Sequence, residues 1–176
     1  PTGKDSLSMT QKYPDGTQVL SPGTLIISTV GPAKDIRKTV HPNLISRRSD
    51  ILWIPFTHTE GYPLGGSAYA QTLCYLGDNT PDVDDAGYFA KCFNTMQELI
   101  CEGHILSGHD ISAGGLITTL LETCFPNTEG GLYIDLSFTS QDALFCEAPG
   151  VIIQTAGDQA ASLLTRKGIN FYEIGE

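Results

Sequence analysis

The sequence predicts an α/β domain in which helices pack on a sheet. Short apolar, β-branched runs alternate with longer segments of helical spacing, and glycine or proline separates most of them. The chain has 176 residues, enough for one domain or for one domain with an additional piece.

The predicted strands are short runs that are apolar throughout or alternate between apolar and polar residues: 24–30, 50–56, 104–108, 131–138, 150–155 and 169–174. The first two are β-branched and apolar without alternation, so we expect both to be buried. Before them, residues 3–13 are predicted to be loop and then a short strand, ending at the turn Pro14-Asp15-Gly16. Residues 35–48 are polar and irregular, and predict a loop with a short turn.

The predicted helices have good helix formers or apolar residues at helical spacing: 67–76, 86–102, 116–124, 141–146 and 158–167. For the longest, Thr80 is the predicted cap, and Pro81 follows at the first position. Its predicted buried face consists of Phe89, Phe93, Met96, Leu99 and Ile100.

Composition excludes several classes of protein. A formal net charge of −10 argues against binding to nucleic acid, which requires a basic face. No run approaches the 18 apolar residues of a membrane-spanning helix. The cysteines are odd in number and lack C-x-x-C spacing, so we expect reduced core thiols in a cytoplasmic protein: Cys74, Cys92, Cys101, Cys124 and Cys146. The abrupt ends at Pro1 and Glu176 predict an excerpt from a longer polypeptide.

Residues 106–121, LSGHDISAGGLITTLL, are the most informative segment. A strand ends, a glycine-rich turn follows, and a helix starts near Gly114, where unpaired N–H groups favour an anion. Asp110 could hold a divalent ion that bridges phosphates, and Ser112 could donate to a phosphate oxygen. An equally favoured interpretation is that Ser112 caps the helix while Gly114 and Gly115 only pack.

Other candidates are weaker. Gly65 and Gly66 precede a predicted helix and could expose N–H donors, but tight packing with Ser67 as the cap is the favoured interpretation. Gly3-Lys4-Asp5-Ser6 resembles the end of a Walker A motif only superficially. His109 adjoins the candidate site, and a structural role is favoured for it. Spacing indicates no catalytic triad, cysteine–histidine pair or amidotransferase nucleophile.

Six stretches together resemble the large, multidomain phosphoribosylformylglycinamidine synthases, relatives of aminoimidazole ribonucleotide synthetase. They are GKDSLSM at 3–9, SPGTLIIS at 21–28, DIRKTV at 35–40, LGGSAYAQ at 64–71, GHDISAGGLITTLL at 108–121 and LFCEAPGV at 144–151. These stretches occur in the family's order along essentially the whole chain. A selenophosphate or thiamine-monophosphate kinase is a weaker match, because the first two stretches favour the purine enzyme.

The resemblance implies the C-terminal subdomain of the second synthetase-like half, with a three-layer α/β/α sandwich. Residues 1–20 would end the preceding N-terminal-type subdomain, and residues 21–176 would form the C-terminal-type domain. The implied reaction of the whole protein is ATP-dependent conversion of formylglycinamide ribonucleotide to the amidine, with ammonia from glutamine. The implied partners are the N-terminal synthetase-type subdomain and the glutaminase domain of the same polypeptide. Alone, the fragment is expected to be inactive and able to dimerise through apolar surface left bare.

The family pattern H-D-x-S-D-G-G matches residues 109–115. By resemblance, Asp110 is a Mg²⁺ ligand and Ser112 contacts ATP or ADP at an auxiliary site, while no residue here is catalytic. Ala113 replaces the family's usual aspartate, and Pro149 interrupts the family's F-x-E-E-L-G pattern around Glu147. The lost carboxylate keeps an alternative open, namely a structural or docking subdomain whose nucleotide site has decayed.

Overall fold

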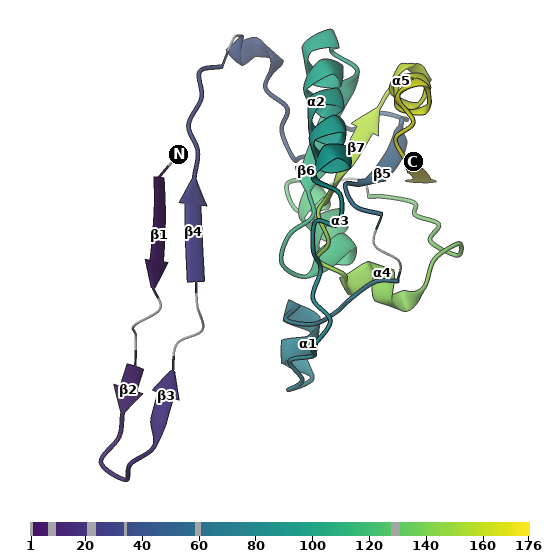
Figure 1. Cartoon of the computed structure of the whole chain (residues 1–176). Helices are drawn as coiled ribbons and strands as arrows, with labels where there is room; N and C mark the ends of the chain where they lie inside the picture. Colours follow the sequence, from purple (N-terminus) through teal and green to yellow (C-terminus); the bar gives the residue numbers. More distant parts are fainter. Residues whose placement is uncertain (1, 7–9, 21–23, 34, 59–60, 128–130) are drawn as a thin grey trace. The chain divides into compact units, whose positions relative to one another are not determined.

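The computed structural model describes the whole chain except residues 1, 7–9, 21–23, 34, 59–60 and 128–130 (Figure 1). The chain divides into two compact units, Pro1–Ile36 and Arg37–Glu176. The first unit extends past residue 20 to Ile36. The assignment of residues 1–20 to a preceding subdomain stays a prediction.

The first unit is a β-hairpin built from two antiparallel ladders. Strand β1 (Thr2–Ser6) pairs with β4 (Thr24–Ser28), and β2 (Thr10–Lys12) pairs with β3 (Gln18–Leu20). The predicted turn at 14–16 is confirmed: Gly16 has a φ of +86°, and its N–H donates to the carbonyl of Tyr13 at 3.0 Å. The Asp15 carboxylate accepts the N–H of Thr17 at 2.9 Å, which lowers the pKa of that carboxyl.

Strand β4 corrects the prediction of a buried strand over residues 24–30. Ile26 and Ile27 are 60% and 63% exposed, and Val30 is almost fully exposed. The β-branched run does form a strand, as its propensity predicts, but within its own unit it belongs to a single two-stranded layer. Segment 3–13 also differs from the prediction, since two strands occupy much of it rather than a loop and one strand.

The second unit contains a four-stranded sheet in the order β6-β7-β5-β8, with antiparallel neighbours throughout. Its strands are β5 (Asp50–Pro55), β6 (Ile105–Asp110), β7 (Gly150–Thr155) and β8 (Tyr172–Gly175). Trp53, on the central strand β5, lies opposite Ile152 on one side and Tyr172 on the other. The prediction that 50–56 is a buried strand is confirmed for Asp50–Pro55.

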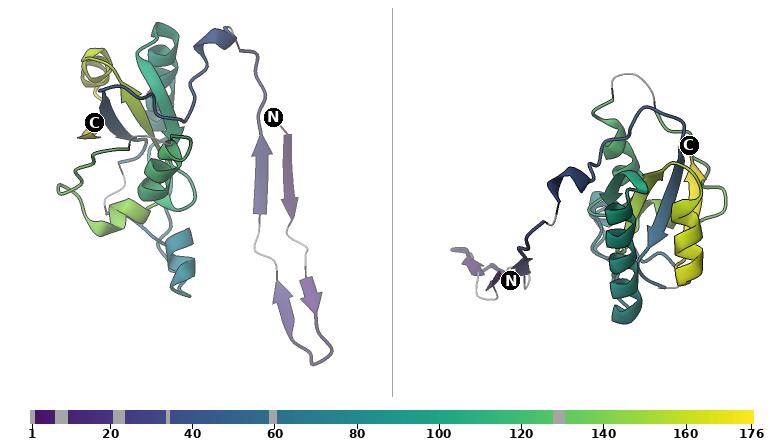
Figure 2. Two further views of the ribbon diagram at one scale, coloured as in Figure 1. Left: turned by 180° about the vertical axis from the view of Figure 1, so that it is seen from behind. Right: turned by 90° about the horizontal axis from the view of Figure 1, so that it is seen from above.

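Helices cover both faces of this sheet, as the two views in Figure 2 show. One face carries α2 (Ala86–Glu102) and α5 (Gln159–Lys167), and the other carries α3 (Gly115–Cys124) and α4 (Gln141–Phe145). Leu52 and Ile54 point into the first core, while Ile51 and Trp53 point into the second. This alternation follows from the two-residue period of a strand and confirms the predicted three-layer α/β/α arrangement.

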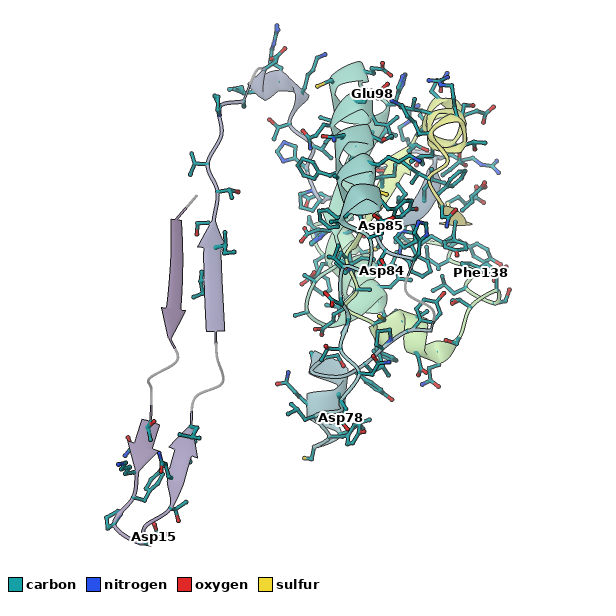
Figure 3. The ribbon with its side chains drawn as sticks, in the orientation of Figure 1. Asp15, Asp78, Asp84, Asp85, Glu98 and Phe138 are labelled. Atoms are coloured by element: carbon teal, nitrogen blue, oxygen red, sulfur yellow. The ribbon has the colours of Figure 1, made fainter. Side chains whose placement is uncertain are left out.

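Helix α2 has the predicted length but a different cap and a rotated buried face. Its N-cap is Asp85, whose carboxylate accepts the N–H of Tyr88 at 2.9 Å, so the predicted cap at Thr80 is wrong (Figure 3). Phe93 was predicted to be buried, but it is 50% exposed. The buried residues of α2 are Tyr88, Cys92, Thr95, Met96 and Leu99.

Two further elements depart from the predictions. Helix α1 (Ala68–Thr72) covers only the first part of the predicted 67–76, and Ser67 caps it as predicted. Segment 131–138 is no regular strand: Ile134 forms an isolated bridge with Gly175. Beside this bridge, Asp135 donates its N–H to the carbonyl of Ile174 at 2.8 Å, and its side chain accepts the N–H of Ser137 at 2.9 Å. The short turn predicted in 35–48 is the single 3₁₀ turn Ile36–Lys38.

The prediction that all five cysteines are core thiols is right for only some of them. Cys92 and Cys146 are buried, Cys124 is half-buried, and Cys74 and Cys101 are exposed; all five are free thiols. Burial raises the pKa of both the Cys92 and the Cys146 thiol. Separately, no helix in the described part of the chain combines the length and apolar character needed to cross a bilayer.

The N-cap assignment for α2 predicts that Asp85→Ala lowers the free energy of unfolding by about 1 kcal/mol, because the Tyr88 amide loses its acceptor. Urea denaturation of the chain followed by circular dichroism measures this. Thr80→Ala is the matched control and should change stability little. A larger effect at Thr80 than at Asp85 would contradict the assignment.

Thiol burial predicts two classes of reactivity toward a disulfide reagent at pH 8. Cys74 and Cys101 should react in seconds to minutes, whereas Cys92 and Cys146 should react only when denaturant opens the core, because both access and thiolate fraction are reduced. Cys74→Ser should remove one fast-reacting thiol and leave the slow class unchanged. Rapid labelling of Cys146 in the native protein would contradict the structure.

Candidate functional site

Asp110 is the last residue of β6, an edge strand of the sheet. Its side chain is 78% exposed, so the carboxylate is accessible from solvent where the strand ends. The sequence-based hypothesis requires this accessibility, because a buried carboxylate could not reach a metal-bound phosphate. Whether Asp110 holds a metal stays a prediction.

His109 lies beside Asp110 and is held by two elements. Its Nδ1 atom is 2.8 Å from the main-chain oxygen of Asp110 and 3.4 Å from the carboxylate atom Oδ1. Its Nε2 atom is 3.5 Å from the Glu122 carboxylate on α3. The ring is mostly buried and joins the end of β6 to the last turn of α3. This supports the structural role that the sequence favoured for His109.

The start of α3 is already occupied by a carboxylate of the same chain. Glu147, which follows α4, accepts the N–H of Gly114 at 2.8 Å through its Oε1 atom. The same oxygen accepts the N–H of Ala68 at the start of α1, also at 2.8 Å. Both donors lie at helix N-termini, where the macrodipole favours negative charge. Glu147 therefore takes the position at Gly114 that the sequence predicted for an anionic ligand.

Gly114 and Gly115 serve packing rather than ligand access. Gly114 is the N-cap of α3 with a φ of +89°. A Cβ atom on Gly115, whose φ is +72°, would lie 2.6 Å from the backbone carbon of Phe145. The N–H of Gly115 donates to the carbonyl of Ser112 at 3.0 Å. The packing interpretation of these glycines is thus supported, and their N–H groups bond within the chain.

Ser112 lies between Asp110 and the α3 N-cap and is exposed. It is not the cap of α3, because Gly114 holds that position and no side chain caps the helix. That part of the packing interpretation is therefore wrong, and the exposed Ser112 follows the end of β6 by two residues. A nucleotide contact through Ser112 stays a prediction.

The side chains of this loop could supply only some of the ligands that a magnesium–phosphate group requires. Mg²⁺ in proteins is commonly held by one or two carboxylates together with substrate phosphates and water. Asp110 supplies one accessible carboxylate, and Ala113 supplies none. Among the described residues, no three His, Cys, Asp or Glu side chains are grouped closely enough to hold a metal ion.

The glycines at 65 and 66 also use their amides internally. Gly65 donates to the carbonyl of Asn79 at 2.7 Å, and Gly66 donates to that of Leu76 at 2.6 Å. A Cβ atom on Gly65 would lie 2.5 Å from the Asn79 oxygen. The packing interpretation favoured from the sequence agrees with this geometry. The lysine-containing segment 3–6 belongs to the hairpin unit, and nothing is described of its side chains.

Glu147 is the residue whose role sequence reasoning missed. The sequence marked its surroundings as a departure from the family pattern, but did not assign it a contact. Its two donors lie 79 and 33 residues earlier in the chain. No local pattern reports such a pairing.

The sequence also places the chain in a protein family. Residues 58–176, more than half of the chain, match the family described as AIR synthase related protein, C-terminal domain. The chain belongs to this family.

Individual relatives show which kind of protein within this family the chain resembles. The chain is 39% identical over 158 residues to a probable chloroplastic/mitochondrial phosphoribosylformylglycinamidine synthase of Arabidopsis thaliana. This match covers 86% of the chain and 11% of the relative. It is 36% identical over 182 residues to the phosphoribosylformylglycinamidine synthase of Homo sapiens, covering 98% of this chain and 13% of the relative. The predicted resemblance to these synthases is confirmed, and the chain spans only a small part of their length.

Solved structures show the same fold. "T. maritima PurL complexed with ATP" superposes with a TM-score of 0.56 at 13% identity, covering 88% of this chain and 24% of that one. "T. maritima PurL complexed with FGAR" gives a TM-score of 0.57 at 15% identity, over 80% of this chain and 26% of that one.

The bridge through Glu147 predicts a stability effect. Glu147→Ala leaves the Ala68 and Gly114 amides without their acceptor, and we expect the free energy of unfolding to fall by about 2 kcal/mol. Glu147→Gln keeps an oxygen acceptor without the charge and should lose roughly half as much. Urea denaturation measures both, with Glu173→Ala, an exposed carboxylate on β8, as the control. Equal losses at Glu147 and Glu173 would show that the bridge contributes nothing.

Proposed function

We propose that this chain is the C-terminal subdomain of the second synthetase-like half of a multidomain phosphoribosylformylglycinamidine synthase. Family membership, identities of 36–39% and the small share of each relative that the chain covers support this. Its proposed partners are the other domains of the same polypeptide, namely an N-terminal synthetase-type subdomain and a glutaminase domain. The prediction that residues 1–20 close that preceding subdomain belongs to the same proposal.

The proposed reaction of the whole protein is conversion of formylglycinamide ribonucleotide to the amidine, with ATP consumed and ammonia taken from glutamine. The names of the relatives support the reaction, and the structural neighbours complexed with ATP, ADP and FGAR are consistent with it. We propose that this chain supplies no catalytic residue and is inactive alone. A cytoplasmic location is proposed as well, although one relative is named chloroplastic/mitochondrial.

Within that protein, we assign this chain an auxiliary magnesium–nucleotide site. Asp110 is the proposed metal ligand, and Ser112 is the proposed contact to ATP or ADP. The observation that carries the assignment is the exposed Asp110 carboxylate at the end of β6, with the exposed Ser112 two residues later on the loop. When bound, Mg²⁺ would neutralise phosphate charge. The chain's own part is to position the carboxylate and hydroxyl, and His109 orients the end of β6.

Glu147 constrains how the nucleotide can approach. A phosphate placed directly on the Gly114 amide would displace this carboxylate or meet its negative charge. We therefore propose that phosphates are held through Asp110 and Ser112, away from the Gly114 amide. The remaining ligands would come from the preceding subdomain.

The alternative function is a structural or docking subdomain whose nucleotide site has decayed. Ala113 favours it, because the usual carboxylate is missing. The exposed Ile26 and Ile27 of β4 and Val30 beyond it favour it as well, since exposed apolar side chains gathered on one segment are typical of a surface that another segment covers. The isolated chain could use the same surface to dimerise. A net charge of −10 argues against nucleic acid as the partner in either case.

Calorimetric titration with Mg-ADP separates the two functions, using both the chain and the longer polypeptide that contains it. Asp110→Asn should weaken binding at least about tenfold when Mg²⁺ is present, because a metal ligand loses its charge, and Ser112→Ala should weaken it about tenfold. Asp78→Asn, an exposed carboxylate elsewhere, is the control. If the longer polypeptide binds Mg-ADP equally well with and without Asp110→Asn, or not at all, the docking function is supported instead.

A further inference from the structure

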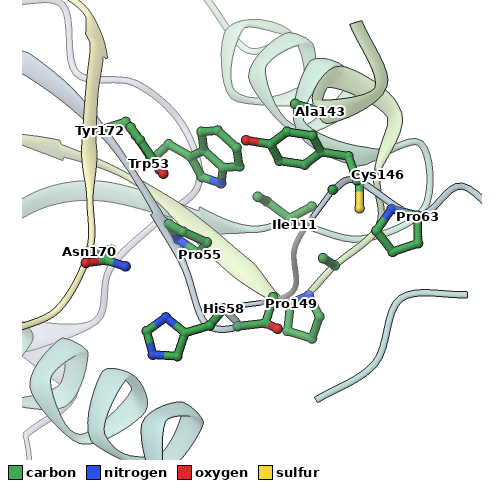
Figure 4. Close-up of a pocket in the computed structure, with 14 residues that line it drawn as sticks. Trp53, Pro55, His58, Pro63, Ile111, Ala143, Cys146, Pro149, Asn170 and Tyr172 are labelled. Carbon is green, nitrogen blue, oxygen red and sulfur yellow. The ribbon is translucent and has the colours of Figure 1, made fainter. Parts of the chain in front are cut away.

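The segment between α1 and the cap of α2, residues 73–84, forms an exposed arm. None of its residues is buried, and Figure 1 shows α1, from which the arm leaves, at one end of the sheet unit. Three large apolar side chains lie within four positions: Leu73, Tyr75 and Leu76 are 61%, 66% and 71% exposed. The cavity beside β5 shows the contrast, since Trp53 in its wall is only 5% exposed (Figure 4).

Backbone hydrogen bonds hold the arm in a defined conformation. Gly66 donates its N–H to the carbonyl of Leu76 at 2.6 Å, and Gly65 donates to that of Asn79 at 2.7 Å. Between the apolar side chains, Cys74 has a φ of +54°, a left-handed conformation that residues other than glycine adopt infrequently. The arm therefore presents its apolar side chains from a fixed backbone, not from an unstructured tail.

The arm is acidic as well as apolar. No Lys or Arg occurs between residues 49 and 90, whereas that stretch contains six Asp and Glu residues, four of them at 78–85. Asp84 and Asp85 accept hydrogen bonds within the chain. Asp78, two residues after Leu76, is exposed, as is Asp82, and Figure 3 shows Asp78 beside α1. The exposed surface of the arm thus combines apolar side chains with negative charge.

These two properties indicate the kind of partner that fits the arm. Exposed apolar side chains gathered on one segment mark a docking surface, and negative charge beside them favours Lys or Arg on the partner. A second copy of the chain is disfavoured, because it carries the same net charge of −10 and the same acidic arm. The match to each relative spans only 11–14% of that relative, so most of such a polypeptide lies outside this chain.

From these observations we infer that the arm docks on another domain of the longer polypeptide, at a face with an apolar centre and a rim of Lys or Arg. Leu73, Tyr75 and Leu76 enter the apolar centre, and Asp78 and Asp82 pair with the rim. The inference deepens the proposed function, because it names the surface that joins this subdomain to a partner domain. It rests on the proposed function for the existence of that domain.

The exposed Cys74, which lies among the apolar side chains of the arm, reports whether the arm is covered. We expect iodoacetamide, without Mg²⁺ or nucleotide, to modify Cys74 at least about tenfold more slowly in the longer polypeptide than in this chain, because a docked arm excludes the reagent. Peptide mass spectrometry measures the rate at this cysteine, and the urea-unfolded polypeptide is the reference for full labelling.

Two variants of the longer polypeptide test the chemistry of the docking. Asp78→Lys combined with Asp82→Lys reverses the charge beside the apolar side chains, and Leu76→Gln removes an apolar contact. Each should raise the labelling rate of Cys74 at least about threefold. Glu173→Lys, at an exposed carboxylate on β8, is the matched control and should leave the rate unchanged.

Equal labelling of Cys74 in this chain and in the longer polypeptide would overturn the inference, and so would protection that persists in both arm variants. Urea denaturation of this chain with the same substitutions should match the parent, because the changed side chains are exposed. These outcomes are independent of the Mg-ADP titration, since labelling is carried out without nucleotide and the arm variants leave residues 109–115 unchanged.

Discussion

The architecture of the candidate site depends on one carboxylate. Glu147 accepts the first amide of α1 and the N-cap amide of α3 through a single oxygen, and so joins three segments that are far apart in the sequence. Charge-assisted hydrogen bonds of this kind are among the stronger polar interactions in proteins. The loop that carries Asp110 and Ser112 lies between β6 and α3, so its exit is fixed by this bridge, and its entry is fixed by the pairing of β6 with β7.

This constraint changes what the glycine-rich turn can do. A strand, a turn and a helix start normally provide an anion site made of amides, yet here the amides of Gly114 and Gly115 bond within the chain. The exposed side chains of this turn include Asp110 and Ser112. A phosphate held by side chains such as Asp110 needs a cation to neutralise the negative charges. The missing carboxylate at Ala113 is therefore expected to lower the affinity for that cation more than it affects the fold.

The two units differ in how completely they bury their apolar side chains. The sheet unit buries residues on both faces, and its central strand β5 contributes to two separate cores. The hairpin unit leaves Ile26, Ile27 and Val30 exposed, and a two-stranded ladder is marginal in water without a covering layer. The relatives are much longer than this chain, which agrees with the proposal that another part of a larger polypeptide covers the hairpin.

The sequence by itself determined the local elements and the family: β5, β7, α2, the turn at 14–16 and the motif at 109–115 follow from propensity, periodicity and residue order. Tertiary structure alone decided which of them are covered. The strand at 24–28 has the composition of a core strand, yet Ile26 and Ile27 are exposed, and the buried face of α2 is rotated from the predicted one. The contacts of Glu147 and the exposure of the arm at 73–84 were also beyond prediction. Propensity acts over a few neighbouring residues, whereas a hydrogen bond or the covering of a side chain depends on segments tens of residues apart that only folding brings together.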